Sequence, residues 1–332
     1  MDTRSATRRP VLLRLMVRIV PPGCPLVTLG LIALLLVGSE AVVAATAPPA
    51  PAEATPEAEA AELDFVDVLF TPTPLPGTDI TLAYRFERTR ERTESGDVIS
   101  YNHEVSVGLS WAITDWLGVS LGIPYQITDV RTTDPATGAQ VAPDTRNLGD
   151  LTLGSQVTFY TNPAWRFAIG GALELGLPTG SIADGTGGQW TVKPSLIVGQ
   201  WLGPVQLLAD LGFGWELRHL SPDEARGQEL TYNVAVAYPL VEQRVIPFLE
   251  LNGAYVAQGD PALKHRGQLY LSPGLRVFPF GGAPAEAGTG RPPDKAEPPW
   301  WHDLSLAVGG QFPLTASRAF EWGITTALKV DF

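Results

Sequence analysis

The chain contains four histidines, the side chains best suited to acid–base chemistry near neutral pH: His103, His219, His265 and His302. A hydrolytic site also needs a nucleophile and an orienting group within hydrogen-bond reach of the base. Only His103, between Asn102 and Glu104, has suitable sequence neighbours, and an interfacial histidine near the end of a strand explains it better. We therefore predict no catalytic residue and no enzyme activity.

Metal and nucleotide chemistry have no stronger support. No two histidines have the spacing of zinc ligands, and the single cysteine, Cys24, lies near the amino terminus. The glycine-rich stretch LPTGSIADGTGG, residues 177–188, lacks the strand-to-helix setting of a phosphate loop. A net charge of −12 argues against a nucleic-acid partner, because phosphate contacts need an excess of Lys and Arg. We expect no metal, cofactor or nucleic acid.

Charged side chains instead recur on one face of alternating segments, where they would line the inside of a closed sheet. The candidates for this inner face are Arg85, Glu87, Glu104, Asp150, Arg166, Glu174, Lys193, Asp210, Glu216, Arg218, Glu250, Arg276, Glu321 and Lys329, with Asp303 and the uncharged Gln156, Asn252 and Gln268. Such charges are tolerated only if they are hydrated or paired. Acids outnumber bases among them, so a pore would be weakly cation-selective.

The elements that carry these residues have a period of two throughout. Apolar and polar residues alternate in about twelve segments, which begin near residue 79 and continue to residue 332. The segments are about ten or more residues long, as a tilted membrane-crossing strand requires. Their apolar faces carry Trp and Tyr near the strand ends, where a membrane protein places its aromatic girdles.

The connections between these segments alternate between short turns and longer polar loops. This is the layout of an all-β fold, a transmembrane up-and-down antiparallel β-barrel with periplasmic turns and termini. Loops are expected at residues 89–99 and 131–147, among others. Residues 281–301 break the rule, so they are either a disordered insertion or a sign of a miscounted strand. The rival architecture is an exported β-sandwich or jelly roll, for which shorter strands of ~5–6 residues suffice.

The first 78 residues indicate export. A basic segment, an apolar run and small residues near Ala45 predict a secretory signal peptide over residues 1–45, with translation beginning at Met1 or Met16. A retained membrane anchor is the alternative, but the apolar run is interrupted at residues 38–40. Residues 46–78 are predicted to be an Ala/Pro/Glu-rich periplasmic linker, of which residues 46–64, built almost entirely of Ala, Pro and Glu, are expected to be disordered. The barrel is then expected over residues 79–332.

The carboxy terminus ends on an aromatic residue within an alternating strand. Phe332, Val330 and Leu328 share its apolar face. This last strand must pair with the first, because an unpaired strand edge is not tolerated in lipid. The ending also resembles the signal read by the bacterial barrel assembly machinery. We therefore expect that machinery and outer-membrane lipid as partners.

Three short motifs resemble those of a known family. They are Gly-Asp-Leu within NLGDLTLGSQVTFY (147–160), Pro-Thr-Gly within LELGLPTG (173–180) and Pro-Gly-Leu-Arg within YLSPGLRV (270–277). They resemble the signposts of the outer-membrane channel family named for the meta-pathway of phenol degradation. The resemblance covers most of residues 79–332, with residues 281–301 as a departure. It implies a Gram-negative outer-membrane location and passage of aromatic or other small hydrophobic solutes.

Two functions remain open from the sequence. In the first, the lumen is a narrow water-filled channel for small solutes, since a twelve-stranded barrel lies between the filled eight-stranded barrels and the wide porins. In the second, the acids and bases pair into a plug, and the barrel is a scaffold that acts through its loops or periplasmic tail. The sequence does not identify the solute or the oligomeric state.

Overall fold

The computed structural model describes residues 63–93, 96–133, 140–141, 144–181, 187–218, 227–240, 244–258, 266–280, 303–316 and 318–332. The predicted signal peptide, most of the predicted linker and the predicted insertion at 281–301 lie outside these residues. Among the described residues, no helix combines the length and the hydropathy needed to cross a membrane.

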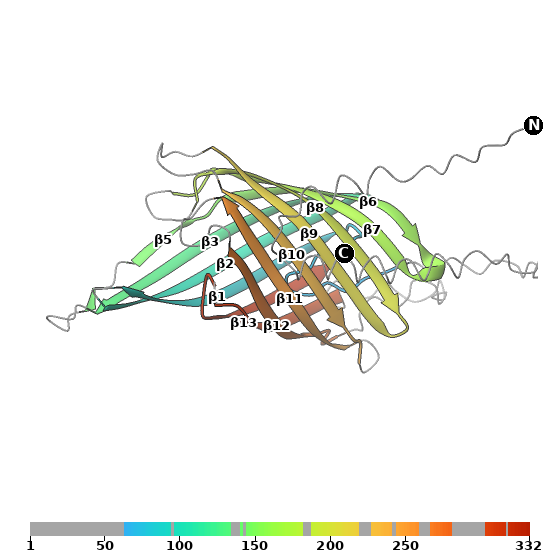
Figure 1. Ribbon diagram of the computed structural model, residues 1–332. Coiled ribbons are helices and arrows are strands. Elements are labelled where there is room, and N and C mark those ends of the chain that lie inside the picture. The colour runs from blue at the N-terminus through green and yellow to red at the C-terminus, as the bar shows by residue number, and fades with distance from the viewer. Residues whose placement is uncertain are drawn as a thin grey trace, which may run out of the picture. The chain divides into compact units, whose positions relative to one another are not determined.

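Twelve long antiparallel strands form one closed barrel (Figure 1). They are β1 (Asp79–Thr93), β2 (Gly96–Thr114), β3 (Leu117–Thr133), β6 (Leu151–Asn162), β7 (Phe167–Leu177), β8 (Trp190–Leu202), β9 (Val205–Arg218), β10 (Gln228–Ala237), β11 (Val245–Gln258), β12 (Arg266–Val277), β13 (Leu304–Pro313) and β14 (Trp322–Asp331). Two short strands, β4 (Gln140–Val141) and β5 (Asp144–Leu148), pair only with β3. The prediction of an all-β transmembrane barrel of about twelve strands is confirmed.

The barrel closes between its first and last strands. β1 pairs with β2 on one side and with β14 on the other, from Asp79 opposite Asp331 to Arg88 opposite Trp322. One further hydrogen bond continues this seam, from the Phe332 backbone N–H to the Thr78 carbonyl oxygen at 2.9 Å. Closure leaves none of the twelve strands with a free edge along its full length, which is the condition for a sheet to sit in lipid.

The two faces of the wall have opposite character, as the alternation predicts. Large apolar side chains point outward and stay exposed in the isolated chain, among them Ile80, Leu82, Trp111, Leu153, Leu173, Val236, Leu249, Leu306, Ile324 and Leu328. Polar side chains such as Gln206, Glu250, Ser272 and Arg276 are buried on the inner face. Lipid is the natural solvent for the outer surface, because apolar area of this extent is unfavourable in water.

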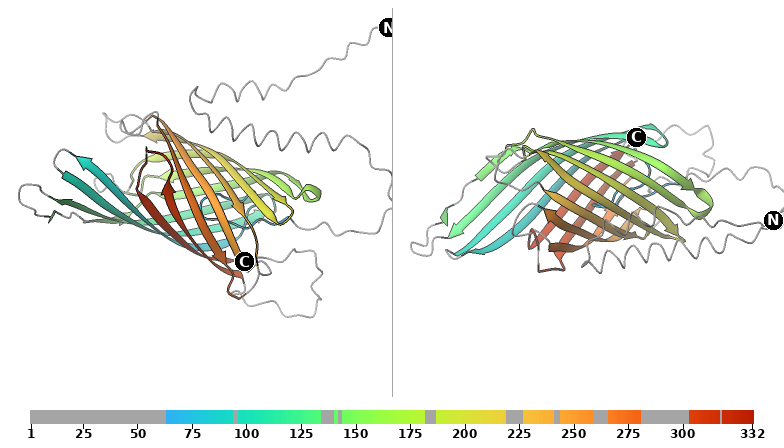
Figure 2. Two further views of the ribbon diagram at one scale, coloured as in Figure 1. Left: turned by 60° about the horizontal axis from the view of Figure 1, so that its bottom comes forward. Right: turned by 45° about the horizontal axis from the view of Figure 1, so that its top comes forward.

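The strands differ in length around the barrel. β1, β2 and β3 contain 15, 19 and 17 residues, whereas β13 and β14 contain 10 each. The long strands therefore project beyond the rest of the wall, at the end opposite to the one where β1 begins and β14 ends (Figure 2). We call the end with the start of β1 the proximal end and the other the distal end.

Two of the expected loops are wrong in extent. Residues 89–93 and 96–99 belong to a paired hairpin, with Thr93 opposite Gly96, instead of a long loop. Within residues 131–147, β3 continues to Thr133, and β4 and β5 pair back onto it. Polar strand ends that rise above a membrane lose the apolar alternation that marked the strands, so they resemble loops in sequence.

The predicted linker is also wrong at its carboxy-terminal part. Residues 63–78 do not continue a disordered tail, because Phe65, Val66, Val68 and Thr71 are buried against the inner face of the barrel. We call residues 63–78 the lumen segment. The folded part of the chain therefore begins ahead of the predicted boundary at Asp79.

Candidate functional site: the barrel lumen

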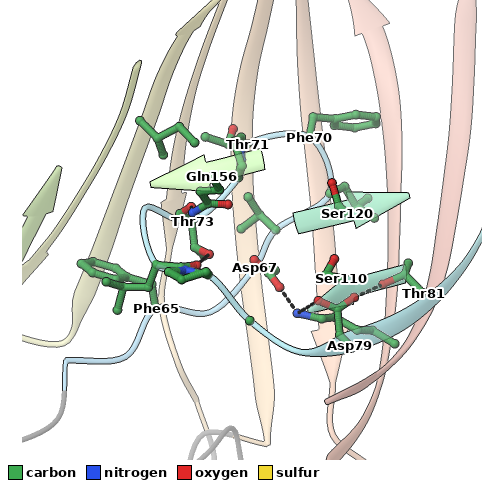
Figure 3. A pocket seen from close by; sticks show the side chains of 18 of the residues that line it. Phe65, Asp67, Phe70, Thr71, Thr73, Asp79, Thr81, Ser110, Ser120 and Gln156 are labelled. Atoms are coloured by element: carbon green, nitrogen blue, oxygen red, sulfur yellow. Dashed lines mark hydrogen bonds and ion pairs between the residues drawn. The ribbon is translucent and has the colours of Figure 1, made fainter. Parts of the chain in front are cut away.

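The lumen segment is held to the wall at several points, first through a charge cluster at the proximal end. The Lys329 ammonium on β14 pairs with the Asp67 carboxylate of the segment and lies 2.8 Å from Asp331 and 3.6 Å from Asp79. Figure 3 shows Asp67 and Asp79 converging on this one amino group. Burial would raise the pKa of Asp67, but Lys329 and Arg276 outweigh that effect and hold it below its ordinary value.

A second attachment comes from β8 and β9. The Gln206 side chain accepts a hydrogen bond from the Val66 N–H at 2.7 Å and donates one to the Val66 carbonyl at 2.6 Å. The Trp201 indole N–H donates to the Asp64 carbonyl at 2.7 Å, and its ring stacks on Phe65 with 6.5 Å between centroids. Burial, with Asp67 nearby, raises the pKa of the Asp64 carboxyl to about 6.

A third attachment uses two buried charged residues of the wall. Glu250 on β11 is fully buried, and one of its oxygens accepts from the backbone N–H groups of Phe70 and Thr71, both at 3.0 Å. Arg276 on β12 donates to the Val68 carbonyl at 3.3 Å and to the Ser305 hydroxyl at 2.7 Å. A buried charge is tolerable only with such partners, so these residues and the segment stabilise one another.

The end of the segment crosses to the opposite part of the wall. Gln156 and Thr158 on β6 donate to the Thr73 and Pro74 carbonyls, both at 2.8 Å. The segment is thus bonded to strands on both sides of the lumen, although it adds no strand to the sheet. Its hydrogen bonds to β6, β8, β9, β11 and β12 and its ion pair with β14 all use wall side chains.

A cavity of about 610 Å³ remains beside the lumen segment. It is lined by the segment and by residues of β1, β2, β3, β6, β7, β8, β9, β10, β12 and β14, with Figure 3 showing Ser110, Ser120 and Gln156 on its border. The predicted inward residues Glu174, Lys193 and Asp210 also line it. Glu174 stays exposed although it faces inward, so free volume adjoins its side chain.

Several other predicted inward residues lie towards the distal end. Arg85 and Glu87 on β1 pair with each other, and the Arg85 guanidinium lies 5.8 Å from the Phe320 ring centre. Glu104 on β2 accepts a hydrogen bond from the Gln126 side chain at 3.2 Å. Glu216 on β9 accepts from the Gly227 N–H at 2.7 Å. The partners named for these groups therefore belong to the barrel itself and not to the lumen segment.

Some predicted lumen residues occupy other places. Arg166 lies in the turn before β7, with a left-handed backbone, and its guanidinium sits 4.6 Å from the Trp201 ring centre. Glu321 precedes β14 and pairs with Arg88 and, at 3.9 Å, with Arg318. Arg218 is the last residue of β9, and its side chain lies outside what the structure describes.

Asp150 is the clearest departure from the predicted site. It lies outside the strands, directly ahead of β6, and its carboxylate accepts from the N–H groups of Gly180 and Gly188 at 2.8 and 2.7 Å and of Gln189 at 3.1 Å. Beside it, the Thr179 hydroxyl donates to the Gly149 carbonyl and accepts from the Leu151 N–H. These hydrogen bonds join the Gly-Asp-Leu motif to the Pro-Thr-Gly motif. A carboxylate that accepts from several backbone N–H groups stabilises the loop that carries them.

Sequence reasoning missed the inner occupant of the barrel. Its anchoring side chain Gln206 and the segment residues Phe65, Asp67 and Val68 were not singled out. A signal was present, because the composition changes from Ala, Pro and Glu to LDFVDVLF at residues 63–70. Such a run can bury apolar area, whereas the preceding residues cannot.

His103 takes no part in the lumen. It lies opposite Phe86 on the outer face, and its ring nitrogen is 2.8 Å from the Tyr84 hydroxyl. Within the described ranges, no three His, Cys, Asp or Glu side chains are grouped so that they could hold a metal ion. The absence of enzyme activity remains a prediction.

The carboxy-terminal residues lie at the closing seam. Leu328 and Phe332 are exposed on the outer face, and Val330 is opposite Ile80 of β1. Deleting Phe332 is expected to reduce outer-membrane insertion, because the closing strand loses a lipid-facing aromatic and its last hydrogen bond to Thr78. Membrane fractionation measures this. A Phe332→Tyr variant is the control and should insert normally, while normal insertion of the deletion variant would argue against a role in assembly.

A closed twelve-stranded barrel with an apolar exterior and a polar lumen is the architecture of outer-membrane proteins. The chain belongs to the family described as "Putative MetA-pathway of phenol degradation", whose model matches residues 78–279. No curated protein sequence matches it.

One solved structure shares the fold, and two others are more distantly similar. The COG4313 outer-membrane channel from Pseudomonas putida F1 is 15% identical with a TM-score of 0.54, over 82% of this chain and 100% of that one. The NanC porin is 9% identical with a TM-score of 0.44, over 76% and 98% of the two chains. The translocator domain of the autotransporter NalP from Neisseria meningitidis is 8% identical with a TM-score of 0.45, over 77% and 88%.

Proposed function

We propose that this protein is a passive outer-membrane channel for small solutes. The observation that carries the proposal is the free volume of about 610 Å³ in the lumen, bordered by the inward-facing Glu174 and Lys193. Membership of a family described by a phenol-degradation pathway, and a fold shared with an outer-membrane channel, support it. Small hydrophobic or aromatic molecules are the solute class that this family description suggests.

A second function is favoured by a specific observation. The lumen segment is bonded to six strands of the wall and fills part of the proximal lumen. If the segment never leaves, the barrel is a plugged scaffold, which acts through its distal loops or through the residues ahead of the segment. The two functions differ in whether ions pass through the barrel.

Conductance in a planar bilayer separates the two functions. We expect the full chain to give a small conductance and a variant lacking residues 63–75 to give one several-fold larger, because the deletion empties the proximal lumen. The deletion removes no strand, so a heat-dependent shift in gel mobility should still report a closed barrel. If neither correctly folded protein conducts, the scaffold function holds and the channel is rejected.

A further inference from the structure

The outward-facing residues of β1 change from apolar to basic along the strand. They are, in order, Ile80, Leu82, Tyr84, Phe86, Arg88 and Arg90. The pairing of β1 with β14 ends at Arg88, and beyond it β1 belongs to the long strands that project past the rest of the wall (Figure 2). The arginines therefore begin where β1 leaves the apolar band of the barrel.

An aromatic cluster on the outer face marks the edge of that band. The centre of the Phe86 ring lies 5.1 Å from those of His103 on β2 and Trp322 on β14, and 6.2 Å from that of Tyr101 on β2. Arg88 is the next outward residue of β1 and is opposite both Tyr101 and Trp322. Aromatic side chains of this kind gather at the lipid–water boundary, so the arginines lie at the level of the lipid headgroups.

Neighbouring elements bring further arginines to the same level. Arg131 on β3 has a side chain 52% exposed, and its guanidinium lies 5.1 Å from the Tyr101 ring centre. Arg146 on β5 is exposed, and so is Arg318 in the loop between β13 and β14, 3.9 Å from Glu321. We call these arginines together the basic patch: Arg88, Arg90, Arg131, Arg146 and Arg318.

The spacing within the basic patch suits an anion with more than one charged group. Arg90 and Arg131 are both opposite Ile99, one on each side of β2. Two strand spacings therefore separate their backbones, which is about 10 Å. Two guanidinium groups so placed can bind two different acceptors of one ligand.

The basic patch keeps a positive excess in spite of its ion pairs. Arg88 and Arg318 share Glu321, and Arg131 lies 4.0 Å from Asp129. Among the side chains that the structure describes on this face, arginines outnumber carboxylates, although the chain as a whole has a net charge of −12. A guanidinium has five N–H donors and a bidentate carboxylate uses two of them, so an ion pair does not exhaust it. The planar donor fork of arginine also matches phosphate.

A row of apolar and aromatic side chains lies directly proximal to the basic patch on the same strands. Tyr84, Val105, Tyr125 and Leu148 are opposite one another on β1, β2, β3 and β5, and are 37%, 40%, 39% and 53% exposed. A soluble anion needs only the arginines, whereas a lipid also needs an apolar surface for its chains. The row and the patch together suit a ligand with an anionic headgroup and long acyl chains.

We propose that the basic patch binds the phosphate groups of lipopolysaccharide, the phosphorylated glycolipid of the outer leaflet. Its lipid A part carries phosphates on a disaccharide, which meet the arginines on both sides of β2, and its acyl chains pack on the apolar row. The proposal rests on an outer-membrane location with the termini in the periplasm, which places the distal end on the outside. It is independent of what passes through the lumen.

Binding of lipid A to the chain refolded in detergent, and thus free of native lipopolysaccharide, tests the proposal. Native mass spectrometry measures the apparent dissociation constant. We expect Arg90→Gln/Arg131→Gln to raise it by roughly tenfold, because charge-assisted hydrogen bonds to phosphate are lost. The pair of Arg88 with Glu321 at the closing seam stays intact in this variant. Equal binding by the native chain and the variant would overturn the proposal.

A charge-matched variant is the control. Arg244→Gln/Arg266→Gln changes two exposed arginines, one in the turn before β11 and one at the start of β12, and should bind lipid A within about twofold of the native chain. An equal loss of affinity in this variant would show that net charge, and not the patch, binds the lipid. Heat-dependent gel mobility checks that each barrel is closed, and Arg90→Gln alone repeats the test if the double variant does not close.

Two further ligands separate the phosphate from the lipid. Lipid A stripped of its phosphates should bind the native chain roughly tenfold more weakly than intact lipid A. Equal affinity for the two would overturn the role of the arginines. Inorganic phosphate at millimolar concentration should not displace lipid A, because it lacks the acyl chains that contact the apolar row. Complete displacement would assign the patch to a soluble anion and overturn the lipid.

Discussion

Replacing Leu173 with Lys is expected to lower the free energy of unfolding of the barrel by roughly 2–4 kcal/mol, the cost of a cation on the lipid face near the bilayer midplane. Leu173 lies near the middle of β7, and its side chain is 41% exposed on the outer surface. Denaturant unfolding of protein folded into phospholipid vesicles, followed by tryptophan fluorescence, measures the change.

The next residue along the strand is the matched control. Glu174 points into the lumen, and the Glu174→Lys variant should unfold within about 1 kcal/mol of the native protein, because a hydrated lumen screens the new charge. In a salt gradient its reversal potential should instead shift towards anions, since an inward carboxylate has become a cation. Equal destabilisation by the two substitutions would show that the assignment of inner and outer faces is wrong.

Replacing Asp150 with Ala is expected to free the loop between β7 and β8 from the start of β6. The change removes three hydrogen bonds from a carboxylate to the N–H groups of Gly180, Gly188 and Gln189. Hydrogen bonds to a charged group contribute about 1.5–3 kcal/mol each, so loss of the set should raise exchange of these amides by more than roughly tenfold. Hydrogen–deuterium exchange measures this peptide by peptide.

Asp150→Asn is the informative control for this loop. An asparagine in the same orientation keeps the oxygen that accepts from Gly180 and Gly188 but loses the one that accepts from Gln189. Its exchange rates should therefore lie between those of the native protein and Asp150→Ala. Exchange in both variants at the native rate would show that the loop is held by other contacts, such as those of Thr179.

The alternation of the sequence was sufficient for the barrel. A period of two over ten or more residues specifies a strand with one apolar and one polar face. About twelve such strands must form a closed barrel in lipid, because an unpaired strand edge is not tolerated there. The inner positions of Glu174, Lys193, Asp210, Glu250, Arg276 and Lys329 follow from the same parity. Parity failed at strand ends, for Arg166, Asp150 and Glu321, because turn and loop geometry redirects a side chain there.

What occupies the lumen was decided by the tertiary structure alone. The groups that hold residues 63–78 to the wall lie far along the chain, so no local pattern indicates that Gln206, Glu250 and Lys329, more than a hundred residues away, meet them. Those side chains come together at the proximal end of the lumen only when the strands that carry them have paired in the native register. The sequence by itself determined a barrel with a polar interior. Only the tertiary structure determined that residues 63–78 fill part of this interior. The contacts between these residues and the wall join strands from opposite sides of the lumen, so they can form only after the barrel has closed.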